Sequence, residues 1–202
     1  MKTFDLSHFL DDHMSLFPGS ESPGFIRRSD FPSQPYREMH LSMSTHSGTH
    51  MDAPAHMIEN GKFLDEFEVS QFMGKAVKIN IERFEKEKWL PEGTEFLILE
   101  TGWSKHWGTT AYLDDFPCLS KESVKFLKTK NLKGIGVDAI SFDPVESTNY
   151  YNHYQLLGTG MIFLENLSDL SMLPDGELFD FFCFPLKIRK ADGSPVRVIA
   201  II

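Results

Sequence analysis

Cysteine and positive charge are both scarce in this chain. Its two thiols, Cys118 and Cys183, stand among apolar or aromatic neighbours and are expected to be buried, which excludes a disulfide framework and a cysteine-based zinc site. Lys and Arg number 20 against 29 Asp and Glu, for a formal net charge of −9. Because phosphate binding requires clustered cationic side chains, nucleic acid is excluded as a partner.

Long apolar runs are also missing. No stretch is long enough to span a bilayer, and Asp5 falls where a secretory signal would continue without a charge. We therefore predict no membrane partner and a cytoplasmic location. The segment from Ser15 to Gly24 is rich in Gly, Pro and Ser, and is expected to be a solvent loop or a lid rather than regular structure.

What the chain does have is a spread of strand-forming segments. The β-branched, apolar and aromatic content predicts strands within the ranges 3–6, 76–81, 95–100, 133–138, 161–164, 178–188 and 196–202. The spacing of Val124 and Leu127 predicts a helix over 119–128, which completes a βαβ order. Since no internal repeat is present, we expect residues 1–202 to form a single α/β domain around a mixed, curled or barrel-like sheet with flanking helices.

The most informative segment, residues 46–56, reads HSGTHMDAPAH. It gathers three imidazoles and a carboxylate within eleven positions, the composition of a metal site. Such groups are seldom clustered without partners, although a polar loop of ordinary histidines is the alternative.

Local geometry limits how these four side chains could meet. A helix at about 100° per residue cannot turn all four to one face. On a strand they share a face, but at about 3.3 Å per residue His46 and His56 would lie roughly 33 Å apart, too far for one metal ion. The segment must therefore enter extended and then curl, and Gly48 and Pro54 fall where the bend is needed.

The approach to this segment predicts a strand. Met39, Leu41 and Met43 alternate with polar residues in the period-two pattern of a strand with one apolar face. His46 continues the polar face in the same register, so we expect this strand to lead directly into the histidine cluster.

A curled segment seldom supplies a whole metal site, so ligands from elsewhere in the chain are expected. His153 follows an aromatic pair in a loop, and Glu165 ends the apolar run 161–164, where an unpaired buried carboxylate would be costly. A metal ion would neutralise that carboxylate. The alternatives are an acid exposed at a strand end and an ordinary histidine.

These residues resemble a known family, the cyclase or bacterial kynurenine formamidase-like amidohydrolases. Residues 46–56 match the family motif His-x-Gly-Thr/Ala-His-x-Asp-Ala-Pro-x-His at every defined position. The likeness covers essentially the whole chain, including His153, Glu165 and the segments 17–19, 136–138, 142–147, 185–187 and 194–197.

The resemblance implies a fold, a cofactor and an assembly. The family fold is a compact α/β domain of the swivelling β/β/α type that commonly forms homodimers or larger homo-oligomers. The metal is usually a pair of zinc ions, and sometimes one manganese ion in the branch similar to isatin hydrolase. The implied metal ligands are His46, His50, Asp52, His153 and Glu165. Asp52 would bridge two ions, and His56 would be the catalytic histidine outside the coordination shell.

The implied reaction is hydrolysis of a C–N or C–O bond in a small amide, formamide, cyclic amide or lactone. Zinc lowers the pKa of bound water to about 7, which supplies a metal-bound hydroxide as nucleophile. His56 would carry the proton to the leaving atom, as an unperturbed pKa near 6.5 permits. Phe17, ahead of a Pro-Gly turn, is expected to contact the substrate. The formamidases have Trp at the position of Phe17 and commonly an acid at that of Ser20, and these departures bear on which substrate is used.

Some roles stay open on the sequence alone. His50, Asp52 and His153 mimic the facial triad of a non-haem iron(II) oxygenase, but that assignment leaves the other three candidates unexplained. A non-catalytic binding protein would hold its metal in a closed site, and the spare histidine at position 56 favours catalysis instead. The acids Asp138, Asp143 and Glu146 could orient ligating imidazoles or act as turn and capping residues.

Overall fold

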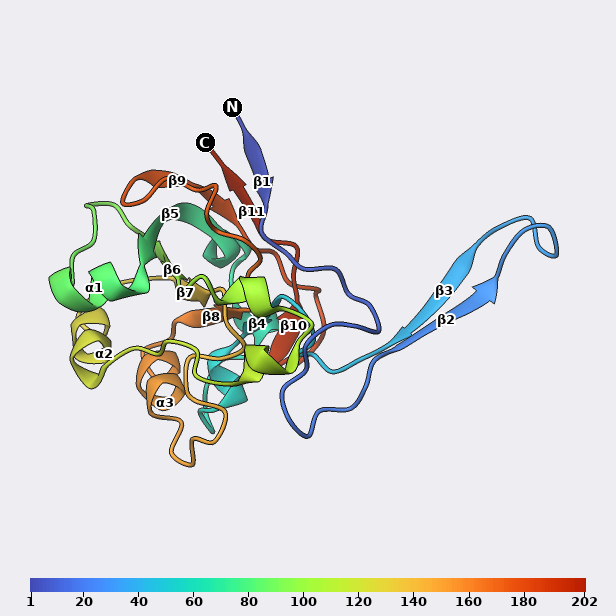
Figure 1. Cartoon of the computed structure of the whole chain (residues 1–202), viewed down its shortest axis with the longest axis horizontal. Coiled ribbons are helices and arrows are strands. Elements are labelled where there is room, and N and C mark those ends of the chain that lie inside the picture. The colour runs from blue at the N-terminus through green and yellow to red at the C-terminus, as the bar shows by residue number, and fades with distance from the viewer.

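A mixed sheet of nine strands forms the centre of the molecule (Figure 1). The computed structural model describes residues 1–202. The strands, in chain order, are β1 (Thr3–Asp5), β4 (His50–Asp52), β5 (Met73–Asn80), β6 (Phe96–Glu100), β7 (Gly134–Val137), β8 (Ile162–Glu165), β9 (Leu178–Phe182), β10 (Gly193–Pro195) and β11 (Ile199–Ile201). Their order across the sheet is β1-β11-β9-β5-β6-β7-β8-β4-β10, with β5 to β8 mutually parallel and every other neighbour antiparallel.

The central strands are buried on both faces because their residues alternate between two apolar clusters. In β6, Leu97 and Leu99 join one cluster, whereas Phe96 and Ile98 join the other. Successive side chains of a strand point to opposite faces, so a continuous apolar run is what a doubly covered strand requires.

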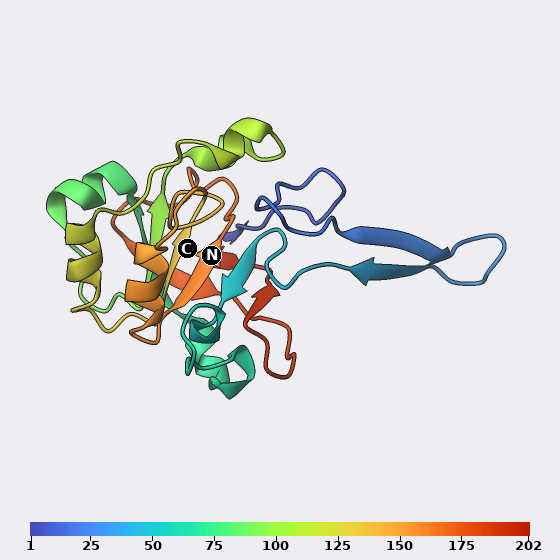
Figure 2. The same ribbon diagram turned by 90° about the horizontal axis from the view of Figure 1, so that it is seen from below.

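Three helices cover one face of this sheet (Figure 2). They are α1 (Ile81–Glu87), α2 (Lys121–Leu127) and α3 (Tyr151–Leu157). The side chains of Asn80 and Ser120 cap the first two by accepting hydrogen bonds from backbone N–H groups of the first turn. The segment β6-α2-β7 links two parallel strands, so the predicted βαβ unit is confirmed.

The other face of the sheet closes on itself. The second apolar cluster takes residues from both ends of the strand order, such as Met51 in β4 and Ala200 in β11, together with Phe181 in β9. The sheet must therefore curl around this cluster, and the predicted α/β fold with a mixed, curled sheet is confirmed.

Most predicted strands are present, with ends displaced by a few residues. The longest prediction, 178–188, is a strand only as far as Phe182. Of the two thiols, Cys183 is buried but Cys118 is partly exposed, so the expectation for Cys118 was wrong. No helix is both long and apolar enough to cross a membrane.

A two-stranded hairpin, which we call the arm (residues 24–42), stands apart from the sheet (Figures 1 and 2). It consists of β2 (Gly24–Ser29) and β3 (Glu38–Ser42). The strand predicted from Met39 and Leu41 is thus confirmed, but its apolar face is exposed. The strand also ends at Ser42, so the expectation that it runs on into His46 was wrong. The turn that follows β3 redirects the chain toward the sheet.

Candidate metal centre

Two antiparallel strands bring the first candidate ligands together. In the register of β4 with β8, His50 lies directly opposite Glu165, and Asp52 projects from the same face of β4 two residues later. All three side chains are buried. Nε2 of His50 lies 3.3 Å from Oδ1 of Asp52 and 3.5 Å from Oε2 of Glu165.

The turn before β4 and the bend after it add His46 and His56. Gly48 has φ +64°, which suits a residue without a side chain, and it packs directly against Leu10. After β4 a short 3-10 helix, Pro54–His56, with Pro54 at its first position, brings the ring of His56 to 4.1 Å from that of His46. The predicted curl is present after β4, but the chain also turns at His46 and Gly48 before this strand, so the expectation that the segment enters in an extended form was wrong.

His153 reaches the cluster from helix α3, so the expectation that it lies in a loop was wrong. Both oxygens of Asp143 hold the start of this helix, with Oδ1 accepting from the backbone N–H of Asn152 and Oδ2 from that of His153, each at 3.0 Å. Oδ2 also lies 2.7 Å from Nδ1 of the His153 ring. The other ring nitrogen, Nε2, is thereby turned toward Oε1 of Glu165, 3.3 Å away.

Asp52 is the centre of the cluster because its two oxygens face different ligands. Oδ1 lies 2.7 Å from Nδ1 of His46 and close to His50, whereas Oδ2 faces Nε2 of His153 at 4.0 Å. The donor atoms form two overlapping groups, His46 with Asp52 and His56, and His50 with Asp52 and Glu165, each with its atoms within 4.8 Å of one another.

In His46, His50 and His153, a second contact fixes the ring nitrogen that faces away from the cluster. For His46 this nitrogen lies 3.0 Å from Asp192, and for His50 it lies 2.9 Å from the carbonyl oxygen of Gly48. For His153 it lies 2.7 Å from Asp143. Metal-binding histidines are characteristically fixed in this way, which sets the ring orientation and the tautomer. Side chains and backbone thus turn three ring nitrogens toward the carboxylates of Asp52 and Glu165.

The charges in the cluster suit a bound cation. Burial lowers the pKa of His153, but Asp143 and Glu165 more than compensate and raise it to about 10. Burial also lowers the pKa of His46, and Asp52 with Asp192 raises it to about 9. Oε1 of Glu165 is buried and accepts no hydrogen bond. An orphaned carboxylate oxygen among imidazoles fits a divalent metal ion, which would displace the protons that these rings otherwise hold.

The cluster opens into a hollow of about 370 Å³. All six candidate residues line it, with His56 on its more exposed side. Its apolar wall consists of Phe17, Met57, Ile140 and Tyr150. Phe17 lines this hollow and also packs against the helix-side cluster, so the predicted substrate contact by Phe17 stays a prediction.

Two residues of this site carry no signal in the sequence. Asp192 contacts His46 and lies 3.5 Å from Nδ1 of His56, and Asn166 donates a hydrogen bond to the carbonyl oxygen of Gly48. Asp192 precedes β10, whose pairing with β4 places Gly193 opposite Asp52. Only this strand pairing could have revealed Asp192, since 146 positions separate it from His46 in the sequence. Of the open acids, Asp143 orients His153, whereas Asp138 accepts hydrogen bonds from the turn at Thr101.

Known proteins are similar to this chain over nearly all of its length. The cyclase family model matches residues 4–144. A kynurenine formamidase from Bacillus thuringiensis (strain Al Hakam) is 34% identical over 98% of this chain and 98% of its own length. The chain belongs to the cyclase family. A second relative of this cyclase, the kynurenine formamidase of Bacillus anthracis, is 32% identical over 98% of this chain and 96% of its own length.

Solved structures agree with the family assignment. Isatin hydrolase A from Labrenzia aggregata, bound to benzyl benzoate, superimposes on this cyclase with a TM-score of 0.85 at 28% identity, covering 100% of this chain and 93% of that one. Isatin hydrolase A from Ralstonia solanacearum gives a TM-score of 0.83 at 27% identity, with 98% and 91% covered. The expectation of a metal-dependent amide hydrolase is confirmed, and neither the oxygenase nor the non-catalytic binding protein is favoured.

Proposed function

We propose that this cyclase hydrolyses the amide or ester bond of a small aromatic molecule at the centre formed by His46, His50, Asp52, His153 and Glu165. The observation that carries the proposal is the position of Asp52, whose Oδ1 faces His46 and His50 while its Oδ2 faces His153. A carboxylate shared in this way would suit a site for two metal ions. A pair of zinc ions is our first choice, and a single manganese ion is the alternative.

The bound metal would act as a Lewis acid and lower the pKa of a bound water toward neutrality. The chain's own residues determine where this chemistry takes place. Asp143, Asp192 and the Gly48 carbonyl hold the three imidazoles, so little reorientation is needed when a ligand enters. Burial of Asp52 and Glu165 keeps competing water away from the inner side of the centre.

His56 is the proposed general acid and base. It borders the hollow beside His46, and Asp192 lies 3.5 Å from its Nδ1, which leaves Nε2 available on the other side of the ring. From there His56 would accept a proton from the attacking water and return it to the leaving nitrogen or oxygen.

The proposed substrate is an aromatic formamide, a cyclic amide or a lactone. Phe17, Ile140 and Tyr150 offer an apolar wall against which an aromatic ring could pack, and no Lys or Arg lines the hollow to receive a second negative charge. The relatives are a kynurenine formamidase and isatin hydrolases, whose names describe an aryl formamide and a bicyclic amide as substrates.

Two further expectations stay predictions. A homodimer or a larger homo-oligomer is expected from the family resemblance, and a cytoplasmic location is expected from the sequence. Neither is needed for the chemistry proposed above.

A substrate screen on metal-reconstituted protein tests the proposal. Protein loaded separately with zinc and with manganese is assayed with N-formylkynurenine, isatin and simple aromatic lactones, and turnover of at least one with either metal is expected. Metal-loaded protein that is inert across this panel, with intact folding by circular dichroism, would count against hydrolysis at this centre.

A further inference from the structure

The residue that follows Glu165 shares the hollow of the metal centre with it. Successive side chains of a strand point to opposite faces, yet Glu165 and Asn166 both line this hollow. The backbone of Asn166 explains the exception, because it follows β8 with φ +57°, in the left-handed region that Asn tolerates better than most residues. Asn166 is also buried. A buried polar residue in this costly backbone conformation, at the edge of the centre, points to a function for its side chain.

Three groups of Asn166 fasten it to neighbouring segments. Its side-chain nitrogen donates a hydrogen bond to the carbonyl oxygen of Gly48 at 2.9 Å, and its backbone carbonyl accepts one from the hydroxyl of Thr49. Its side-chain oxygen accepts a hydrogen bond from the hydroxyl of Tyr112 at 3.0 Å. Asn166 is thus tied through both backbone and side chain to the two residues immediately before His50.

The contact with Gly48 bears directly on the proposed ligand His50. Nδ1 of the His50 ring lies 2.9 Å from the same carbonyl oxygen of Gly48. Because a carbonyl oxygen can only accept, Nδ1 carries a hydrogen and Nε2 is the nitrogen left for a metal. Nε2 is also the nitrogen that faces Asp52 and Glu165. The Gly48 carbonyl therefore sets the tautomer and the direction of the His50 ring, and Asn166 holds that carbonyl in place.

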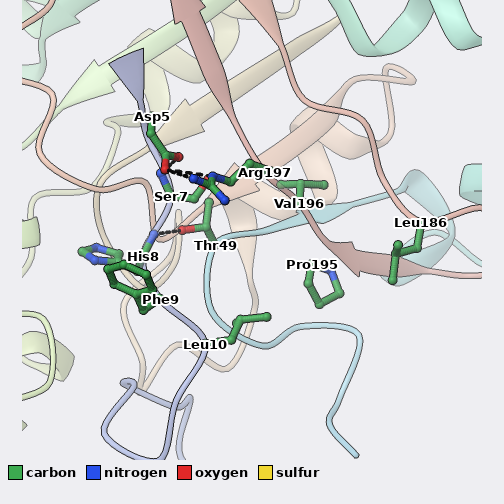
Figure 3. A pocket seen from close by; sticks show the side chains of 10 residues that line it. All are labelled: Asp5, Ser7, His8, Phe9, Leu10, Thr49, Leu186, Pro195, Val196 and Arg197. Atoms are coloured by element: carbon green, nitrogen blue, oxygen red, sulfur yellow. Dashed lines mark hydrogen bonds and ion pairs between the residues drawn. The ribbon is translucent and has the colours of Figure 1, made fainter. Parts of the chain in front are cut away.

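The turn that carries this carbonyl needs such support. A glycine reaches more backbone conformations than other residues, and Gly48 adopts φ +64° in the turn before β4. Thr49 supplies a second tie, since its hydroxyl donates to the Asn166 carbonyl and accepts a hydrogen bond from the backbone N–H of His8 at 2.9 Å (Figure 3). The turn is therefore held by Asn166 and also by the segment that follows β1.

Tyr112 fixes which way round the Asn166 amide lies. The phenol is buried and its hydroxyl donates to the amide oxygen, so the amide nitrogen is directed at Gly48. The phenol is itself held in place. Trp107 packs edge to face against its ring with centroids 5.2 Å apart, and the indole N–H of Trp103 donates to the Tyr112 carbonyl oxygen at 3.2 Å. These aromatic contacts support the amide from outside the hollow.

We propose that Asn166 and Tyr112 form a positioning pair for the metal ligand His50. The Asn166 amide holds the Gly48 carbonyl that orients the imidazole, and the Tyr112 hydroxyl holds the amide. The pair supplies no ligand itself and acts through His50. This inference rests on the proposed function, because it takes His50 to bind the metal. It assigns the pair a contribution to metal affinity, which burial in the fold would not by itself give them.

The zinc affinity of the full chain, measured by chelator competition, tests the pair. Asn166→Gly removes the amide and keeps a residue that adopts φ +57° without strain. Its zinc affinity should fall about 10 to 100-fold, the range typical for a lost partner of a metal-binding histidine. Tyr112→Phe removes only the hydroxyl and should lower the affinity less, by up to about 10-fold. The double variant should bind zinc as Asn166→Gly does, since both residues act through one amide.

A purely structural role would give a different result. Asn166→Gly would then lower the urea midpoint of the metal-free protein and leave the zinc affinity unchanged, which would overturn the proposal. Asn80→Ala is the matched control, because Asn80 caps α1 and does not line the hollow. It should lower the midpoint without changing the zinc affinity. The visible absorption of cobalt(II)-loaded protein depends on ligand geometry and should change in Asn166→Gly, and a spectrum identical to that of wild type would count against the pair.

The outcomes separate this inference from the proposed hydrolysis. Wild type that binds zinc but hydrolyses nothing in the substrate screen would remove the hydrolysis, and the zinc affinities would still decide the role of the pair. Unchanged zinc affinity in both Asn166→Gly and Tyr112→Phe would remove the pair and leave the hydrolysis standing. Wild type that binds neither zinc nor manganese would overturn both.

Discussion

The arm and the histidine cluster are adjacent in sequence but differ in what surrounds them. In the arm, β3 alternates apolar and polar residues and leaves both kinds exposed. A few residues later, β4 alternates in the same way, with His50 and Asp52 on one face and Met51 on the other, and every side chain is buried.

The neighbouring strands explain why β4 is buried and β3 is exposed. β4 lies between β8 and β10 in the large sheet, so its polar face meets Glu165 and its apolar face meets the inner core. β3 has a single neighbour, β2, and no layer packs on either of its faces. Periodicity therefore indicates which residues share a face, whereas the sheet topology determines whether that face packs in the core, lines the candidate metal centre or stays exposed.

The largest effect should come from removing the residue at the middle of the buried region. Asp52→Ala should abolish activity and leave less metal bound, because both groups of donor atoms share this carboxylate. Metal content by atomic emission and turnover on the best substrate of the screen give the two readouts. Asp180→Ala, which removes an exposed carboxylate paired with Lys75, is the control and should change neither. Full metal content in Asp52→Ala would contradict the assignment.

His56 should separate metal binding from turnover. His56→Asn is expected to keep the metal but lower kcat by about 10² to 10⁴, the range typical for loss of a general acid or base. His13→Asn, at an exposed histidine, serves as the control. Unchanged kcat in His56→Asn would remove this residue from the mechanism.

The proposed metal ligands were more predictable from the sequence than the residues that hold those ligands in place. Three of the proposed ligands fall within one local motif, Glu165 ends an apolar run and His153 follows an aromatic pair, so residue type and spacing locate them. Asp192 carries no local signal, because it meets His46 only through the pairing of β10 with β4. Asp143 was ambiguous for the same reason, since its contact with His153 depends on how the loop folds back before α3.

The fold shows the same limit. Strands β6 and β8 could be located because a strand that is buried on both faces has a nearly continuous run of apolar residues, which is uncommon in exposed segments. The exposed state of β3 could not be predicted, since its pattern equals that of a half-buried strand. The break between Ser42 and His46 was hidden as well, because His46 falls on the same side of the alternating pattern as His40 and Ser42 whether or not the strand continues.

The acids behind the imidazoles should have an intermediate effect. Asp143→Asn and Asp192→Asn each remove a carboxylate that orients a proposed ligand, and such losses cost about 10 to 100-fold in metal affinity. Chelator competition measures the affinity directly, independent of turnover. Glu146→Gln is the matched control, since this neighbouring acid is exposed and contacts neither histidine. Equal affinities in all three variants would mean that these acids do not support the centre.

The smallest effect should come from the arm, and two methionines show why. Met51→Ala in β4 removes a fully buried side chain and should lower the free energy of unfolding by about 2 to 5 kcal/mol. Met39→Ala in β3 removes one that is half exposed, and should change it by no more than about 0.5 kcal/mol when the protein is dilute enough to be monomeric. Urea titrations of both variants and wild type measure the two changes. A loss of about 2 kcal/mol or more in Met39→Ala would contradict the exposed position of this side chain.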